Sequence, residues 1–278
     1  IQRAIRNFDT VLLGHISQSL SNAVHACLFG LTGGRGFSVP AGKETQRYYQ
    51  QLTRCSAAFA LAADVSMLVL GGKLKRCESI SARLGDVLSQ LYLSSATLKR
   101  FEDDGRPAED LPLLHWAIQD SLFRIQEAFD GVLQNFPSRL SALILRALIF
   151  PRGKYLTPPS DKLGHQVSVL MQQPGAARDR LTAGMYLSVD EHDAVGALEA
   201  ALHSTLKCEP LQAKVDAAHK AGHVTAVGEL MRIAEAHHKG YINAEEARLL
   251  ERDLTLQRKA IMVDDFAPEQ LMAASNII

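Results

Sequence analysis

Two long helical patterns occupy residues 48–100, and only the pair Gly71 and Gly72 interrupts them. Before the pair, apolar side chains recur around most of the helix circumference, which indicates a helix buried on several sides. After the pair, Leu84, Leu88 and Leu91 follow one stripe, which is typical of a half-buried helix. No segment of the chain alternates apolar and polar residues over the length of a strand. The sequence therefore predicts an all-α fold.

Two more segments show helical periodicity. A first helix is predicted over residues 2–29, and another follows residue 111, where apolar residues recur in steps of four and three. The loop 102–111 is short and polar, so the helices that it joins should be antiparallel neighbours. We therefore expect a bundle of four long helices that run up and down.

The sequence changes character after Pro151, where segments with few periodic apolar residues follow one another. Ser188 and Asn243 are each followed three residues later by a glutamate, the capping-box spacing, so each predicts a helix start. Pro210 and Gly240 are expected to separate the helices in this part. We expect two domains, a long helical bundle over residues 1–150 and a smaller helical subdomain over residues 151–278.

Composition narrows the classes of partner. The chain carries 30 basic and 30 acidic residues, so its net charge predicts no attraction to nucleic acid. The four cysteines, at positions 27, 55, 77 and 208, form no CxxC motif, which fits a reduced, cytoplasmic interior. The chain begins at Ile1 without a signal-peptide pattern, so we expect a segment of a longer protein and not a secreted precursor.

Membrane contact has two interpretations. No apolar run reaches the roughly 18 to 20 residues that spanning a bilayer takes, so we expect no membrane-spanning segment. The segment 136–155 combines a short apolar helix with Arg139, Arg146, Arg152 and Lys154. Such a helix could lie in a membrane interface with its cations at the headgroups. The favoured alternative is a core helix with solvated arginines.

Metal-site spacings occur but are incomplete. His219 and His223 stand four residues apart, and Glu235 with His238 matches the ExxH spacing of di-iron bundles. A metal would need further carboxylate or cysteine ligands at the same point. We therefore expect solvated helix faces and no metal site.

Sequence motifs for catalysis or for a phosphate-binding loop are also incomplete. The glycine-rich run 31–40 lacks the GxxxxGK[ST] pattern between a strand and a helix, so it predicts a turn. GxSxG is absent, and no cysteine stands in a nucleophile signature. The adjacent carboxylates at 103–104, 245–246 and 264–265 are expected to cap helices or face solvent. We assign no catalytic, cofactor-binding or metal-binding residue to this chain.

One motif resembles a known family. The segment 68–74, LVLGGKL, is similar to the QxxGGxG region in the helical bundle of acyl-CoA dehydrogenases. Leu68 stands where the family has glutamine and Leu74 where it has the last glycine, so the groups that would touch FAD are missing. Longer stretches together resemble the C-terminal region of bacterial long-chain acyl-CoA dehydrogenases of the FadE type, and these stretches are 47–93, 111–122, 133–140, 159–165 and 261–271.

The resemblance implies a role within a larger flavoenzyme. Such enzymes convert acyl-CoA to trans-2-enoyl-CoA in fatty-acid β-oxidation and pass the two hydrogens to FAD. The FAD-binding domains and the catalytic glutamate would belong to the preceding part of the protein. The implied partners are the catalytic domain of the same polypeptide, acyl-CoA through the full enzyme, and an electron-transfer partner. The implied location is the bacterial cytoplasm, at the periphery of the inner membrane if residues 136–155 contact lipid.

Three hypotheses follow for the chain itself. In the first, residues 1–150 form a cofactor-free second copy of the dehydrogenase bundle, which packs on the catalytic bundle as a pseudo-dimer and stabilises it. In the second, the chain is a helical interaction module with a large exposed apolar patch. In the third, it is a membrane-surface tether that binds through residues 136–155.

Overall fold

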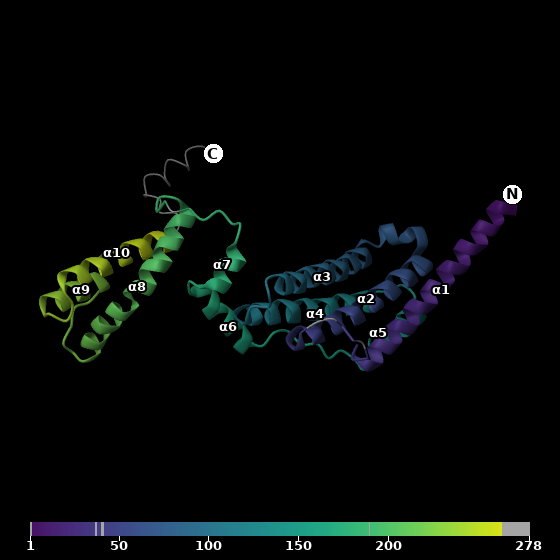
Figure 1. Ribbon diagram of the computed structural model, residues 1–278, viewed down its shortest axis with the longest axis horizontal. Helices are drawn as coiled ribbons and strands as arrows, with labels where there is room; N and C mark the ends of the chain where they lie inside the picture. Colours follow the sequence, from purple (N-terminus) through teal and green to yellow (C-terminus); the bar gives the residue numbers. More distant parts are fainter. Residues whose placement is uncertain (1, 37, 40–41, 189, 263–278) are drawn as a thin grey trace, which may run out of the picture. The chain divides into compact units, whose positions relative to one another are not determined.

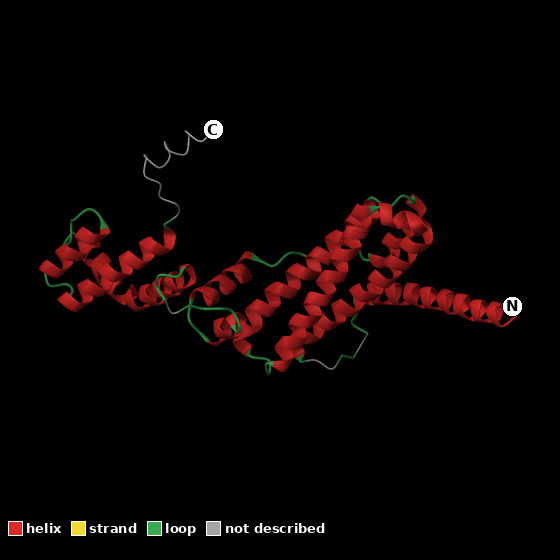
Figure 2. Ribbon diagram, turned by 90° about the horizontal axis from the view of Figure 1, so that it is seen from above, coloured by secondary structure: helices red, strands yellow, loops and turns green. Residues whose placement is uncertain are grey.

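A computed structural model describes residues 2–36, 38–39, 42–188 and 190–262 (Figure 1). Across these ranges the chain forms helices and loops and contains no strand (Figure 2). The predicted all-α class is confirmed. The chain divides into two compact units, Ile1–Ser168 and Val169–Ile278.

The first unit is built mainly from five α-helices and two short 3₁₀ segments. These are α1 (Gln2–Thr32), α2 (Lys43–Leu70), η1 (Gly71–Arg76), α3 (Glu78–Asp103), η2 (Ala108–Asp110), α4 (Leu111–Gln134) and α5 (Arg139–Ile149). Helices α3 and α4 lie side by side and antiparallel, as the short polar loop between them predicts (Figure 1). The four long helices expected from the periodicity are thus all present.

Helix α2 is the centre of this unit and packs against α1, α3, α4 and α5. Leu52, Cys55 and Leu61 on it are buried, and Ile118 and Ile125 on α4 are fully buried in the same core. Helix α2 ends at Leu70 because Gly71 takes a positive φ of 50°, a conformation that costs glycine little. The glycine pair therefore separates two helices of one core.

The span Lys43–Arg76 is long and apolar enough, by length and composition, to cross a membrane. This finding corrects the expectation that no segment reaches that length. The core helix of a bundle has the same length and composition, and α2 buries Gln51, Arg54 and Ser66 beside its apolar residues. Buried polar groups with protein partners fit a position inside the bundle.

Residues after α5 fold back onto the first unit. The backbone N–H groups of Tyr155 and Leu156 both donate to Gln126 Oε1 on α4, each at 3.0 Å. Lys154 pairs with Asp130 on the same helix. The division between the units falls after Ser168, later than the boundary expected after residue 150. Helix α6 (Asp161–Gln172) runs across this division.

The second unit contains α7 (Ala176–Thr182), α8 (Ala194–Lys220), α9 (Glu229–His238) and α10 (Ala244–Ile261). Helices α8, α9 and α10 pack on one another around a small core. The largest members of this core are Val215, Val224, Ile233, Ile242 and Leu250.

Of the two helix starts predicted in this unit, one is confirmed and the other is wrong. Asn243 forms the predicted capping box with Glu246. Ser188 does not start a helix: Asp193 caps α8 by accepting from the N–H groups of Val195 and Gly196, and the Ser188 hydroxyl accepts from Asp190 instead. The boundary was misplaced because an aspartate close by competes for the same role.

Pro210 also departs from the expectation, because it lies inside α8 and does not end it. Cys208 before it and Val215 after it are buried in the same core against α10. This packing outweighs the local cost of a proline within a helix. Gly240 does follow the end of α9, with a positive φ of 76°.

Candidate functional site

An apolar groove of about 750 Å³ runs between α1, α2 and α5. We call it the apolar groove. Its polar lining is limited to four described residues, His15, Ser19, Asp64 and Ser141. Asp64 already accepts from Asn22 Nδ2 at 2.9 Å. The apolar lining comes from all three helices and comprises Leu12, Ile16, Leu20, Ala23, Leu61, Val65, Met67, Leu68, Val69, Ile144, Leu145 and Leu148.

Many of these side chains are open to solvent. The exposed fraction is 85% for Leu68, 65% for Leu20 and 56% for Ile16. The N-terminal half of α1 extends beyond the other helices of the unit, and Val11 and Leu13 on it are also exposed (Figure 2). A contiguous apolar surface of this kind marks an interaction site in most soluble proteins.

The glycine pair follows α2, whose last turn lines the groove with Met67, Leu68 and Val69. Leu68 is among the groove's most exposed members, while Leu74 packs against the core of the bundle. Neither side chain offers a hydrogen-bonding group. The residues at the two positions where the family motif has glutamine and glycine therefore do not fit a flavin.

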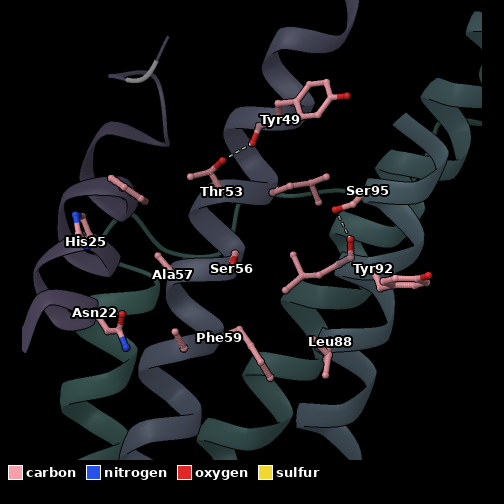
Figure 3. Close-up of a pocket in the computed structure, with 14 residues that line it drawn as sticks. Asn22, His25, Tyr49, Thr53, Ser56, Ala57, Phe59, Leu88, Tyr92 and Ser95 are labelled. Atoms are coloured by element: carbon pink, nitrogen blue, oxygen red, sulfur yellow. Dashed lines mark hydrogen bonds between the residues drawn. The ribbon is translucent and has the colours of Figure 1, made fainter. Parts of the chain in front are cut away.

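A second groove of about 640 Å³ opens between α1, α2 and α3 (Figure 3). Two of its five hydroxyl groups bond to their own helices, since Thr53 Oγ1 donates to Tyr49 O at 2.9 Å and Ser95 Oγ to Leu91 O at 2.8 Å. No aspartate or glutamate stands among its described lining residues. This lining pairs no described nucleophile with a base oriented by a carboxylate, so the groove has no arrangement for acyl transfer.

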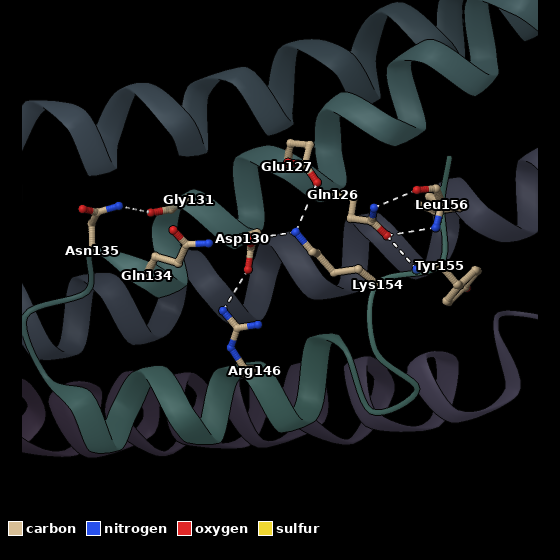
Figure 4. A network of polar contacts seen from close by, with 10 residues as sticks. All are labelled: Gln126, Glu127, Asp130, Gly131, Gln134, Asn135, Arg146, Lys154, Tyr155 and Leu156. Atoms are coloured by element: carbon tan, nitrogen blue, oxygen red, sulfur yellow. Dashed lines mark hydrogen bonds and ion pairs between the residues drawn. The ribbon is translucent and has the colours of Figure 1, made fainter. Parts of the chain in front are cut away.

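Polar contacts on the first unit centre on Asp130 of α4 (Figure 4). Its carboxylate, whose side chain is 7% exposed, accepts from Arg146 Nη2 at 2.8 Å and from Lys154 Nζ at 2.9 Å. Burial alone would raise the pKa of Asp130, but the two cations outweigh it and lower the pKa below its ordinary value. Two of the four cations in segment 136–155 are therefore engaged within the protein.

The segment 136–155 itself has two faces. Leu145 and Ile149 are buried in the core, whereas Leu140, Leu143 and Ile144 are exposed. Helix α5 begins after Ser138, whose hydroxyl accepts from the N–H of Ser141 at 3.3 Å. The segment thus serves as a core helix on one side and adds apolar surface on the other.

Residues at the metal-site spacings make other contacts. Glu235 accepts from the N–H groups of Thr225 and Ala226 and from Lys239 Nζ. The ring nitrogen Nδ1 of His219 lies 2.6 Å from the carbonyl oxygen of Val224. Among the described residues, no three potential ligands come together to hold a metal ion.

The remaining candidates are separate from one another. Cys55 and Cys208 are buried thiols, and Cys27 and Cys77 are half-buried and unpaired. Asp103 and Asp104 form ion pairs with Lys99 and Arg100 on their own helix. Glu246 caps α10, as predicted. The pair 264–265 lies outside the described residues.

Sequence reasoning missed the apolar groove. The spacing of Leu12, Ile16 and Leu20 signals an apolar helix face, but the same spacing is found on faces that are buried. Only the positions of α2 and α5 show that this face is open.

Comparison with known proteins identifies the family. The family described as acyl-CoA dehydrogenase, C-terminal, bacterial type, matches residues 1–266. No solved structure matches the chain. The match covers the first compact unit, most of the second, and the helices described above. The chain belongs to the family of bacterial-type acyl-CoA dehydrogenase C-terminal domains.

Proposed function

We propose that this chain is an accessory domain that docks, through the apolar groove and the exposed face of α1, on the FAD-bearing catalytic part of the same dehydrogenase. In this role it stabilises an enzyme that converts acyl-CoA to trans-2-enoyl-CoA in fatty-acid β-oxidation. FAD and acyl-CoA bind to the preceding part of the polypeptide, and the residues at 68 and 74 take no part in holding the flavin. The exposed apolar surface is the observation that carries the proposal.

The size of this surface supports a stable contact. Burying one exposed leucine or isoleucine side chain contributes about 1.5 to 3 kcal/mol. Ile16, Leu20, Met67, Leu68 and Ile144 are each more than half exposed in the groove. Covering them contributes on the order of 10 kcal/mol before the cost of ordering the contact is subtracted. A partner in the same polypeptide loses less translational freedom than a separate one.

A membrane-surface tether is the second candidate, because Leu140 and Leu143 are exposed beside the groove without lining it. Such a tether would place the enzyme at the periphery of the inner membrane, near an electron-transfer partner. Interfacial helices depend on cations that reach the headgroups. Arg146 and Lys154 instead pair with Asp130. The ion pairs favour the docking surface over the tether.

Serine substitutions in the intact protein test the docking proposal. The variant Ile16→Ser/Leu68→Ser removes two groove side chains that are exposed, so the helices themselves should still form. We expect flavin to be released at a lower temperature, and dehydrogenase activity to be lost sooner on heating. Leu93→Ser is the matched control, because Leu93 is 54% exposed on α3, outside the groove. Equal flavin-release temperatures in the groove variant and the control would refute docking at this surface.

The variant Leu140→Ser/Leu143→Ser separates the two candidates. Under the docking proposal it binds vesicles of phosphatidylglycerol no less than the unmodified protein does. Under the tether proposal, vesicle binding in a co-sedimentation assay is lost.

A further inference from the structure

Three hydrogen-bond donors converge over the turn that follows α1. Arg47 Nη2, Tyr155 Oη and Arg152 Nη1 lie 3.3, 3.7 and 3.8 Å from the position that a Cβ atom on Gly33 would occupy. The three residues come from α2 and from the segment after α5, so the fold alone brings them together. Arg35 belongs to the same turn and is exposed. Gly33 has no side chain, so none of its own atoms stands between the three groups.

A fourth arginine lies beneath this cluster. Arg54 on α2 is only 3% exposed, and its guanidinium stacks over the Tyr155 ring at 5.0 Å from the centroid. Arg54 Nη1 donates to Gln51 Oε1 and Nη2 to the carbonyl oxygen of Ile149. Its Nε has no hydrogen-bond partner. A buried guanidinium with an unsatisfied donor adds positive potential that the protein itself does not cancel.

Within the described ranges, these charges are not offset by ion pairs. Arg35, Arg47, Arg54 and Arg152 form no ion pair with an acidic side chain in the described part of the chain. Burial lowers the pKa of Arg47; Tyr155 acts in the opposite direction, and the three other arginines lower it further.

Helix termini account for only part of the positive charge. Helices α1 and α5 end at Thr32 and Ile149, beside the cluster, and Arg47 Nη1 donates to Gly33 O at 2.6 Å. Each helix C-terminus carries about half a negative charge. Two termini therefore offset about one of the four guanidinium charges. The excess exceeds one unit, which favours a doubly charged anion over a single carboxylate.

The backbone of the glycine turn is not available for such an anion. Gly33 N donates to Gly30 O, Gly34 N to Phe29 O and Arg35 N to Thr32 O, so these amides close the end of α1. The turn therefore does not act as a P-loop, in agreement with its sequence. The arginine side chains would therefore bind the anion, because the N–H groups of a planar guanidinium match the geometry of phosphate oxygens.

We propose that Arg47, Arg152 and Tyr155, with Arg35 at the rim, bind a phosphate group. This site is separate from the apolar groove and does not depend on the docking proposal. The phosphate group can belong to a soluble phosphate compound or to a lipid headgroup, and the same donors would hold either.

Titration of the intact protein with inorganic pyrophosphate tests the proposal for a soluble source. Melting temperature is followed at constant ionic strength, with sodium chloride as the reference salt. We expect a saturable rise with pyrophosphate, and a half-saturation concentration that is raised by roughly tenfold or more in Arg152→Gln. Arg152 is exposed, so this variant should fold even if Arg47→Gln does not. Arg76→Gln, an exposed arginine of η1 outside the cluster, is the matched control and should titrate like the unmodified protein.

Vesicles test the lipid source. Sedimentation with phosphatidylglycerol vesicles that is lost in Arg152→Gln but kept in Arg76→Gln assigns the phosphate to a headgroup. Saturable pyrophosphate binding without vesicle binding assigns it to a soluble compound. If neither probe distinguishes Arg152→Gln from Arg76→Gln, the arginine cluster is not a phosphate site and the proposal is overturned.

Discussion

Replacing Asp130 by asparagine should destabilise the first unit. Asp130 is nearly buried and is the acceptor for Arg146, Lys154 and Gln134, the last at 2.7 Å. Asparagine keeps the shape of the side chain but removes its charge, and its amide group turns one acceptor into a donor that faces cations. A hydrogen bond to a charged group contributes about 1.5 to 3 kcal/mol. The side chain of Arg146 is 43% exposed and regains water, which limits the loss.

We therefore expect the free energy of unfolding to fall by about 2 kcal/mol. Urea denaturation of the 278-residue chain measures it, because the fluorescence of Trp116, its one tryptophan, reports on α4. With a typical slope, the unfolding midpoint moves down by roughly 1 M. Asp120→Asn on the same helix is the control, since Asp120 pairs with an arginine that is 62% exposed. That variant should change the stability by less than about 0.5 kcal/mol.

The effect of Asp130 should also depend on pH. A carboxylate whose pKa is lowered in the folded state contributes stability above its unfolded pKa, which is about 3.9, and loses it as the pH falls through the folded pKa. The stability difference between the unmodified chain and Asp130→Asn should thus stay constant from about pH 6 to 8 and shrink below about pH 4. A variant as stable as the unmodified chain at pH 7, or a gap that is unchanged at low pH, would refute this account of the network.

Two further predictions concern single residues. Gly34→Ala should lower the melting temperature of the first unit, because φ at Gly34 is +76° and a Cβ atom there would lie 2.5 Å from Gln50 O. Gly36→Ala is the control and should leave the melting temperature nearly unchanged, because nothing lies within 4 Å of a Cβ atom at that position. Equal effects of the two substitutions in thermal denaturation would contradict the steric argument. Hydrogen bonds lower the pKa of Glu235 to about 2. The bond from Lys239 has the largest effect, and the bonds from the N–H groups of Ala226 and Thr225 add to it. The chemical shift of its carboxyl carbon should therefore titrate near that value in an NMR experiment. The stability that Glu235 contributes to the second unit is present above the unfolded pKa of about 4.3 and is lost as the pH falls toward 2. A titration midpoint near 4 would show that these hydrogen bonds are absent in solution.

Some features of the fold could be read from local pattern. Steps of three and four placed α1 to α4, because one face of each helix must be apolar for the bundle to form. The capping box at Asn243 was identified because both partners lie within one turn of chain. Where two local signals compete, as Ser188 and Asp193 do ahead of α8, the sequence pattern chose the wrong residue.

Tertiary structure decided the features that depend on distant partners. The periodicity of Leu12, Ile16 and Leu20 predicts an apolar face, but whether that face is covered depends on α2 and α5. Arg54 meets the carbonyl of Ile149 across 95 positions of sequence, and no local spacing records such a contact. The sequence by itself thus determined the helices and the resemblance to a family, since both depend on residues close together along the chain. The open groove and the arginine cluster follow from three-dimensional packing, which joins residues that the chain keeps far apart.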